Sequence, residues 1–214
     1  MKQANDFMPR VTELIEASIT TKQELFRSRE TLSTIAKVSE LLVSALRQGD
    51  KVLLFGNGGS AADAQHIAAE LVGRFAFDRP ALPALALSVN SSCVTAIGND
   101  RGFDQVFARQ LEALARPGDV AVGISTSGNS ANVVHAMSQA REMGLQTVAL
   151  TGRTGGRLKN RVDHCICVPS NETPRIQECH ILIGHILSEI VERELFNQQG
   201  RISRPRRSHR SKSW

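Results

Sequence analysis

The amino-acid sequence predicts an α/β protein in which helices cover both faces of a parallel β-sheet. After residue 50, short β-rich runs alternate with helical stretches, a pattern typical of parallel sheets. Two amphipathic helical stretches precede this alternation, and a longer one follows it. The chain has 214 residues and is 41% hydrophobic, which suits one domain with a substantial core.

The predicted N-terminal helices cover residues 6–27 and 29–48. Apolar residues recur at helical spacing in "TLSTIAKVSELLVSAL", and Gly49 with Asp50 ends the second helix. Five β-rich runs follow, at residues 51–56, 84–88, 119–124, 146–151 and 164–168. The predicted helices between them cover residues 60–74, 103–115, 129–143 and, briefly, 158–160. A last helix over 174–196 has proline in its first turn, where proline favours helix initiation.

Charge divides the chain unevenly. Its net charge is +5, but residues 200–214 contain six of the 26 Lys and Arg residues and no acid. We therefore predict an N-terminal helical segment over 1–50, a main domain over 51–199, and a basic, disordered tail over 200–214. Such a tail could contact nucleic acid or an acidic protein partner, but we expect a solvated tail.

The four cysteines, Cys93, Cys165, Cys167 and Cys179, do not follow a zinc-ligand spacing. We expect them to be reduced, as in a cytoplasmic protein, and Cys165 and Cys167 to share one face of a strand. The N-terminus has no apolar signal region, and no apolar run approaches the roughly 18–20 residues that span a bilayer, so we expect no membrane association.

The first loop with unusual chemistry is "FGNGGSAA", which follows the first predicted strand. Its glycines allow close approach of the backbone to a ligand, and Ser60 is expected to cap the following helix. A dinucleotide site would need an acid near the end of the second strand, but "ALSVNSS" has none. No P-loop motif occurs either, so we expect no nucleotide cofactor.

The second loop, "GISTSGNSAN", contains four hydroxyl side chains between a strand and a helix: Ser125, Thr126, Ser127 and Ser130. A helix cap requires only one such residue. Four of them beside a helix N-terminus favour a phosphate monoester held by hydrogen bonds and the helix dipole.

Two pairs of polar residues share helix faces. His66 and Glu70 are four residues apart, and Gln177 and His185 lie two turns apart on the last helix. Spacing alone does not choose Gln177 over Glu178.

Taken together, "GNGGSAADAQHIAAEL", "IGND", "GISTSGNSAN", "ALTGRTGG" and "RIQECHILIGH" resemble the sugar isomerase (SIS) family, and more narrowly its phosphoheptose isomerases, from about residue 11 to 196. The resemblance implies a flavodoxin-like, doubly wound SIS domain with a five-stranded parallel sheet. It also implies a homotetramer with active sites at subunit contacts, and the isomerisation of sedoheptulose 7-phosphate to D-glycero-D-manno-heptose 7-phosphate for lipopolysaccharide biosynthesis.

The same resemblance implies residue roles. It chooses Gln177 over Glu178 and places one Zn²⁺ per subunit on four ligands: His66, Glu70, Gln177 and His185. Glu70 is the expected base and His185 its acid–base partner in a reaction through an enediol. The substrate-binding residues implied are Asn57, Gly58, Gly59, Ser60, Glu70, Asn99, Asp100, Ser125, Thr126, Ser127, Ser130 and Gln177.

One alternative function belongs to another class of protein, a non-catalytic regulator. A non-catalytic SIS-fold regulator that binds the DnaA replication initiator has a similar sequence, and the basic tail would suit such a partner. That regulator tends to lack the acid and the histidine that match Glu70 and His185, and both are present here. We therefore expect the enzyme.

Overall fold

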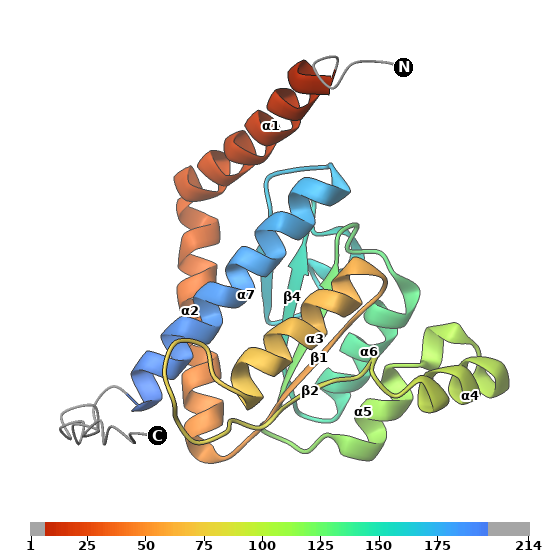
Figure 1. The fold of residues 1–214 in the computed structure, drawn as a ribbon. Helices are drawn as coiled ribbons and strands as arrows, with labels where there is room; N and C mark the ends of the chain where they lie inside the picture. Colours follow the sequence, from red (N-terminus) through yellow and green to blue (C-terminus); the bar gives the residue numbers. More distant parts are fainter. Residues whose placement is uncertain (1–6, 197–214) are drawn as a thin grey trace, which may run out of the picture.

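The fold is an α/β sandwich around one parallel sheet, seen in a computed structural model that describes residues 7–196 (Figure 1). The five strands are β1 (Val52–Gly56), β2 (Ala84–Ala86), β3 (Val120–Ser125), β4 (Gln146–Thr151) and β5 (His164–Cys167). They pair in the order β2-β1-β3-β4-β5, with every neighbouring pair parallel. The predicted doubly wound sheet is thus confirmed.

Helices cover both faces of this sheet. The α-helices are α1 (Met8–Arg27), α2 (Arg29–Gln48), α3 (Gly59–Val72), α4 (Ser91–Arg101), α5 (Ala108–Leu114), α6 (Ala131–Glu142) and α7 (Thr173–Phe196). Two short 3-10 turns, η2 (Phe103–Gln105) and η3 (Gly156–Leu158), complete the described elements. Helices α2, α3 and α7 lie on one face, and α5 and α6 lie on the other (Figure 1).

The strands divide their side chains between two cores. In β1, Val52 and Leu54 face the core under α2, α3 and α7, whereas Leu53 and Phe55 face the core under α5 and α6. This alternation follows from the two-residue period of a strand. Because both faces are covered, all five residues of β1 are buried, which explains its uninterrupted apolar sequence.

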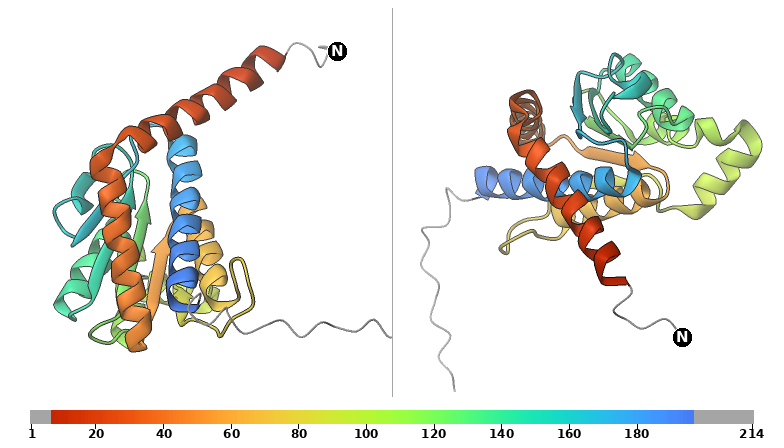
Figure 2. Two further views of the ribbon diagram at one scale, coloured as in Figure 1. Left: turned by 90° about the vertical axis from the view of Figure 1, so that its left-hand side faces the viewer. Right: turned by 90° about the horizontal axis from the view of Figure 1, so that it is seen from above.

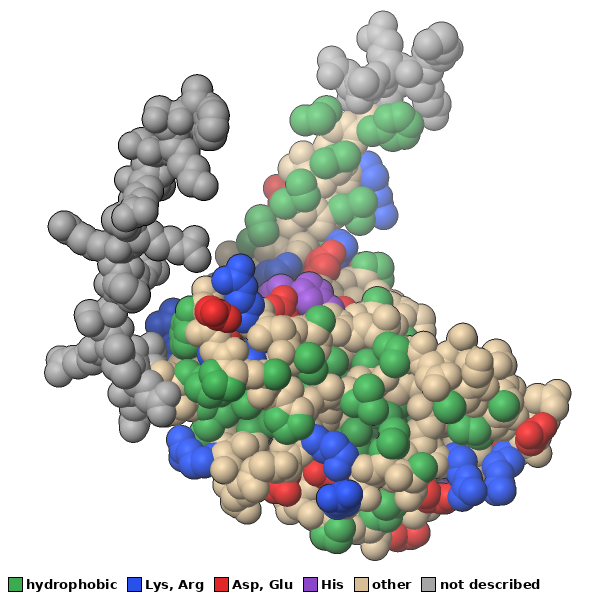
Figure 3. Space-filling model, turned by 60° about the horizontal axis from the view of Figure 1, so that its bottom comes forward, with side chains coloured by type: hydrophobic (Ala, Val, Ile, Leu, Met, Phe, Trp, Pro, Cys, Tyr) green, Lys and Arg blue, Asp and Glu red, His purple; other side chains and the backbone are tan. Residues whose placement is uncertain are grey.

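The first helix stands apart from this layered body. Helix α1 projects beyond it in two views, whereas α2 packs along α7 and β5 (Figure 2). The side chains of Met8, Val11, Ile15 and Ile19 on α1, and of Phe7 at its N-cap, are exposed. Figure 3 shows apolar side chains along this projecting helix.

The sequence prediction missed α4. We expected the second strand to continue to residue 88, but β2 ends at Ala86 and a helix begins at Ser91. The Asn90 side chain accepts a hydrogen bond from the Cys93 N–H and caps this helix. Helix α4 has no fully buried residue and only Val94 and Ile97 pack in part against the core, so its apolar face is too short to indicate a helix.

The ends of other elements differ by a few residues. Helix α3 begins at Gly59 with Gly58 at the N-cap and no side-chain cap, so the predicted capping role of Ser60 is wrong. Gly58 has φ of +54°, a conformation that favours glycine. The division at residues 50 and 199 stays a prediction, and the basic tail lies outside the described residues.

Cys165 and Cys167 share one face of β5, as expected, with their Sγ atoms 3.7 Å apart. All four cysteines are free thiols. Among the described helices, none combines the length and the hydropathy that a bilayer crossing requires.

Candidate functional site

Three of the four predicted metal ligands meet between α3 and α7. His66 Nε2 lies 3.1 Å from Glu70 Oε1 and 3.4 Å from His185 Nε2. The two imidazole rings are 5.0 Å apart in an edge-to-face arrangement. The Phe75 ring lies 5.7 Å from that of His185. We call His66, Glu70 and His185 the triad.

Close packing of two helices brings the triad together. His66 and Glu70 lie one turn apart on α3, so they share a face. Gly184, which precedes His185, packs against Ile67, which follows His66. Because Gly184 has no side chain, the helix backbones approach closely at this point.

The triad has the donor set and the spacing of a metal site. Its three ligand atoms all lie within 4.8 Å of one another. Zinc bonds of about 2.0–2.1 Å at a tetrahedral angle place neighbouring ligand atoms roughly 3.3 Å apart. Two imidazoles and a carboxylate suit zinc and similar borderline cations. The residues present therefore fit a zinc ion.

Gln177, the fourth predicted ligand, lies elsewhere on α7. A β-carbon on Gly59 would be 2.4 Å from Gln177 Nε2, so the amide rests on the first turn of α3. Eight residues separate Gln177 from His185, which is about 12 Å along a helix. Within one chain, the amide is thus placed beside the glycine loop.

Asn57, at the start of the glycine loop, is held by a partner that the sequence analysis missed. Asn57 and Asn132 form two reciprocal amide hydrogen bonds, each of 2.9 Å. Asn132 is buried in the first turn of α6. This pair joins the glycine loop after β1 to the hydroxyl loop after β3.

The hydroxyl loop gathers three serines at the N-terminus of α6. Ser125 Oγ lies 3.0 Å from Ser130 Oγ and 3.5 Å from Ser127 Oγ. Ser130 occupies the N-cap of α6, but its side chain does not cap the helix. The hydroxyls therefore face one another beside a free helix end, an arrangement that suits an anion.

A cavity of about 160 Å³ opens beside this loop, lined by Thr126 and Ser127 together with Arg153 and Thr154 from the loop after β4. The hydroxyl loop itself contains no Lys or Arg. Arg153, from the motif "ALTGRTGG", lines the cavity, while its guanidinium donates to the Pro169 carbonyl at 2.6 Å and lies 3.6 Å from Glu24 Oε2. Only the pairing of β3 with β4 brings the two loops together.

Asn99 and Asp100 are not brought to the triad in this chain. Both are exposed near the end of α4, where the Asn99 amide donates to Asp100 Oδ1 at 2.8 Å. Helix α4 packs mainly on η2 and stands at one side of the molecule (Figure 1).

The triad also lies away from the hydroxyl loop. His66 is seven residues along α3 from Gly59, or about 10 Å. It lines an open groove of about 570 Å³ beside β2, which shares no residue with the cavity at Thr126. The His66 side chain is 48% exposed, so one chain does not enclose the triad.

Comparisons with known proteins identify the family of the chain. A family model described as the SIS domain matches residues 15–152. The chain is 53% identical over 186 residues to a phosphoheptose isomerase from Sulfurimonas denitrificans, covering 87% of this chain and 95% of that protein. Among solved structures, it is similar to phosphoheptose isomerase GmhA from Neisseria gonorrhoeae, with a TM-score of 0.82, 44% identity, and coverage of 87% and 98%. A phosphoheptose isomerase from Francisella tularensis superposes with a TM-score of 0.83 at 38% identity and the same coverage.

Proposed function

The chain belongs to the SIS domain family and, within it, to the phosphoheptose isomerases, and from this membership we propose how it acts. It is an isomerase that converts sedoheptulose 7-phosphate to D-glycero-D-manno-heptose 7-phosphate, a step of heptose biosynthesis. The observation that carries the assignment of roles is the approach of Glu70 and His185 to within hydrogen-bonding range of His66, with all three ligand atoms within 4.8 Å of one another. That the heptose product is used for lipopolysaccharide biosynthesis stays a prediction from the resemblance.

The hydroxyl loop is the proposed phosphate site. Ser125, Thr126, Ser127 and Ser130 would donate hydrogen bonds to the phosphate oxygens beside the N-terminus of α6. Arg153 also lines the cavity beside this loop, with its guanidinium held by the Pro169 carbonyl and 3.6 Å from Glu24 Oε2. Gly59 lies about 10 Å along α3 from His66, and Asn57 ties its loop to the hydroxyl loop; this spacing favours an extended sugar phosphate.

Glu70 is the proposed base of the reaction. An aldose–ketose isomerisation moves a proton between C1 and C2 through an enediol, so it needs a base at carbon and an acid–base partner at the oxygens. Glu70 Oε1 faces His66, so Oε2 would take the proton from carbon. His185 would exchange protons with the substrate oxygens.

His66, Glu70 and His185 would hold a zinc ion. Gln177, the fourth ligand that the family resemblance implies, lies about 12 Å along α7 from His185 and is not part of this ligand set within one chain. When bound, the ion would stabilise the negative charge that develops on the substrate oxygens. Gln177 can also serve the substrate, because it rests on the glycine loop near the hydroxyl loop. Asn57, Gly58, Gly59 and Ser60 would line the path of the sugar chain.

An assay with the purified protein tests the proposal. We expect sedoheptulose 7-phosphate to be converted to heptose 7-phosphate, which anion-exchange chromatography separates from the substrate. Glu70→Gln should lower kcat by roughly 10²–10⁴-fold, the range for loss of a general base. Glu189→Gln, an exposed change on α7, is the matched control and should retain the wild-type rate. Near-normal turnover by Glu70→Gln would remove the assignment of the base.

The comparisons do not favour the alternative of a replication regulator, because the similar proteins are named as isomerases at about 50% identity. A non-catalytic regulator also has no need for the triad. Association with an initiator protein, without turnover of the heptulose phosphate, would reverse this choice.

A homotetramer is the proposed assembly. Its support is the exposed apolar side chains of α1, the isolated position of α4, and the open triad. Subunit contacts would cover these surfaces and could bring Asn99 and Asp100 to a neighbouring site. Light scattering after size-exclusion chromatography should give a mass about four times that of one chain. Four free thiols support the proposed cytoplasmic location.

A further inference from the structure

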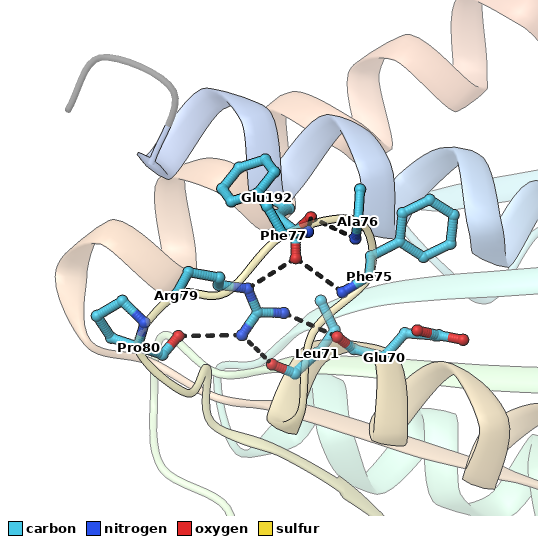
Figure 4. Close-up of polar contacts among 8 residues, drawn as sticks. All are labelled: Glu70, Leu71, Phe75, Ala76, Phe77, Arg79, Pro80 and Glu192. Carbon is cyan, nitrogen blue, oxygen red and sulfur yellow. Dashed lines mark hydrogen bonds and ion pairs between the residues drawn. The ribbon is translucent and has the colours of Figure 1, made fainter. Parts of the chain in front are cut away.

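A buried carboxylate on α7 organises the segment that follows α3. Glu192 Oε1 accepts the N–H groups of Ala76 at 2.6 Å and Phe77 at 3.2 Å, and Oε2 accepts the Phe75 N–H at 2.7 Å (Figure 4). Arg79 Nε donates to the same Oε2 at 3.0 Å. The Glu192 and Arg79 side chains are each 1% exposed.

Arg79 extends this network to the end of α3. Its two terminal nitrogens donate to the backbone carbonyls of Glu70 and Leu71, each at 2.7 Å. The last four carbonyls of a helix lack partners within the helix, and a cation at this end is favoured by the helix dipole. Because α3 has no basic residue in its own last turn, Arg79 supplies this charge from the following loop.

The two halves of the network end at or beside members of the triad. One half reaches the carbonyl of Glu70, the proposed base. The other fixes the backbone of Phe75, whose ring lies 5.7 Å from that of His185. Glu192 also lies seven residues after His185 on α7, on the same face of the helix. Figure 4 shows Arg79 between Glu192 and the end of α3.

We propose that Arg79 and Glu192 are positioning residues that hold Glu70 and His185 at the relative positions that proton transfer requires. This inference rests on the proposed function, because it assigns the pair a role in that same reaction. Neither side chain touches the triad's reacting atoms. Arg79 acts through the Glu70 backbone, and Glu192 acts through the ring of Phe75.

The chemistry of the pair explains why these residue types are needed. The guanidinium of Arg79 makes four hydrogen bonds in a fixed planar fork, to Glu192, Glu70, Leu71 and Pro80. A lysine ammonium keeps the charge but not this geometry. Burial alone would raise the pKa of Glu192, but three backbone N–H groups and Arg79 outweigh it and hold the pKa below its ordinary value. The carboxylate therefore stays charged.

Arg79→Lys and Glu192→Gln are the test variants. Each keeps a polar group of similar size, so we expect folded proteins with lowered stability. We expect kcat to fall roughly 10–100-fold, the usual effect of changing groups that orient ligands and catalytic residues. KM for sedoheptulose 7-phosphate should stay within about twofold, because the hydroxyl loop is untouched. A fall in kcat without a change in KM distinguishes a positioning role from a role in substrate binding.

Asp119→Asn is the matched control for Glu192→Gln. Asp119 is likewise a buried carboxylate, 3% exposed, that accepts two backbone N–H groups and pairs with a cation, Lys51. These contacts lie at the starts of β1 and β3, away from α7 and the segment 73–79. We expect Asp119→Asn to lower the melting temperature comparably and to leave kcat unchanged.

Histidine NMR provides a readout that does not depend on turnover. The imidazole resonances of His185 should shift in Arg79→Lys and Glu192→Gln but not in Asp119→Asn, when each is recorded below its melting temperature. Unchanged kcat and unchanged His185 resonances in both test variants would overturn the inference. So would a loss of kcat in Asp119→Asn that matches the loss in Glu192→Gln. Absence of isomerase activity in the unmodified protein would instead overturn the proposed function.

Discussion

Gly184 on α7 packs directly against Ile67 on α3: a β-carbon on Gly184 would lie 2.5 Å from both Cγ1 and Cδ1 of Ile67. Each residue is the chain neighbour of a triad histidine, since His185 follows Gly184 and His66 precedes Ile67. The spacing between the two imidazoles therefore depends on a contact with no room for one methyl group.

Gly184→Ala should push α3 and α7 apart at the triad. Overpacking of this kind costs about 1–3 kcal/mol of stability, and a displacement of about 1 Å at a catalytic group can lower the rate roughly 10²-fold. Steady-state kinetics and thermal unfolding measure both effects. Adding Ile67→Ala should restore part of the activity, because it removes the atoms that clash. A Gly184→Ala variant with wild-type kcat would contradict this reading of the helix contact.

Gly128→Ala should disable the proposed phosphate site. Gly128 has φ of +66°, and a β-carbon there would lie 2.1 Å from the Gly155 carbonyl oxygen. The hydroxyl loop must move to accommodate the methyl group, so we expect KM for sedoheptulose 7-phosphate to rise at least about tenfold. Gly144→Ala is the control: Gly144 has φ of +78°, but its nearest non-neighbouring atom would be 3.7 Å from the new carbon. It should lose about 1 kcal/mol of stability and keep its KM. Equal KM values for the two variants would count against a phosphate site at this loop.

Removal of metal should abolish turnover if the triad holds zinc. We expect dialysis against a chelator to inactivate the protein, and stoichiometric Zn²⁺ to restore the rate. Metal analysis of the purified protein should find about one ion per chain. His66→Gln should lose the metal, whereas His135→Gln, which changes an exposed histidine on α6, should retain it. Full activity in a metal-free preparation would exclude an essential ion.

The buried His180 should make the fold sensitive to mild acid. Burial lowers the pKa of His180 to about 4 from the ordinary 6.5, against the opposing effect of its contact with the Thr151 carbonyl. Below pH 6.5 the unfolded chain takes up a proton that the folded protein resists, so stability falls from pH 6.5 toward pH 4. Between pH 7 and 5 this amounts to about 2 kcal/mol.

Urea unfolding of the wild type and of His180→Leu at pH 7 and 5 isolates this effect. Burial raises the pKa of Asp63 to about 6, although nearby His66 opposes the shift, and the titration of Asp63 changes stability in the opposite direction. Asp63 is present in both proteins, so the difference between their pH dependences reports on His180. If the two proteins lose the same stability on acidification, His180 is not the responsible group.

The pattern of apolar residues was sufficient to predict the layered fold. The bounds of α2 and β4 match the prediction, because a buried face imposes its period on the sequence. Helix α4 escaped prediction because it has no fully buried residue and only Val94 and Ile97 pack in part against the core. The hydroxyl loop could also be predicted, since all its serines lie within six residues.

Contacts between distant segments were decided only by the tertiary structure. The 3.4 Å approach of His66 to His185 spans 119 residues and depends on the packing of Gly184 against Ile67. Three other contacts also join segments that are distant in the sequence. They are the pairing of Asn57 with Asn132, the position of Arg153 beside the hydroxyl loop, and the Arg79–Glu192 network. The sequence by itself determined which side chains lie on which face of each element, because that follows from helix and strand periods. Which faces meet and which atoms touch depend on how the helices pack on the sheet. The period of a single helix or strand does not determine that packing.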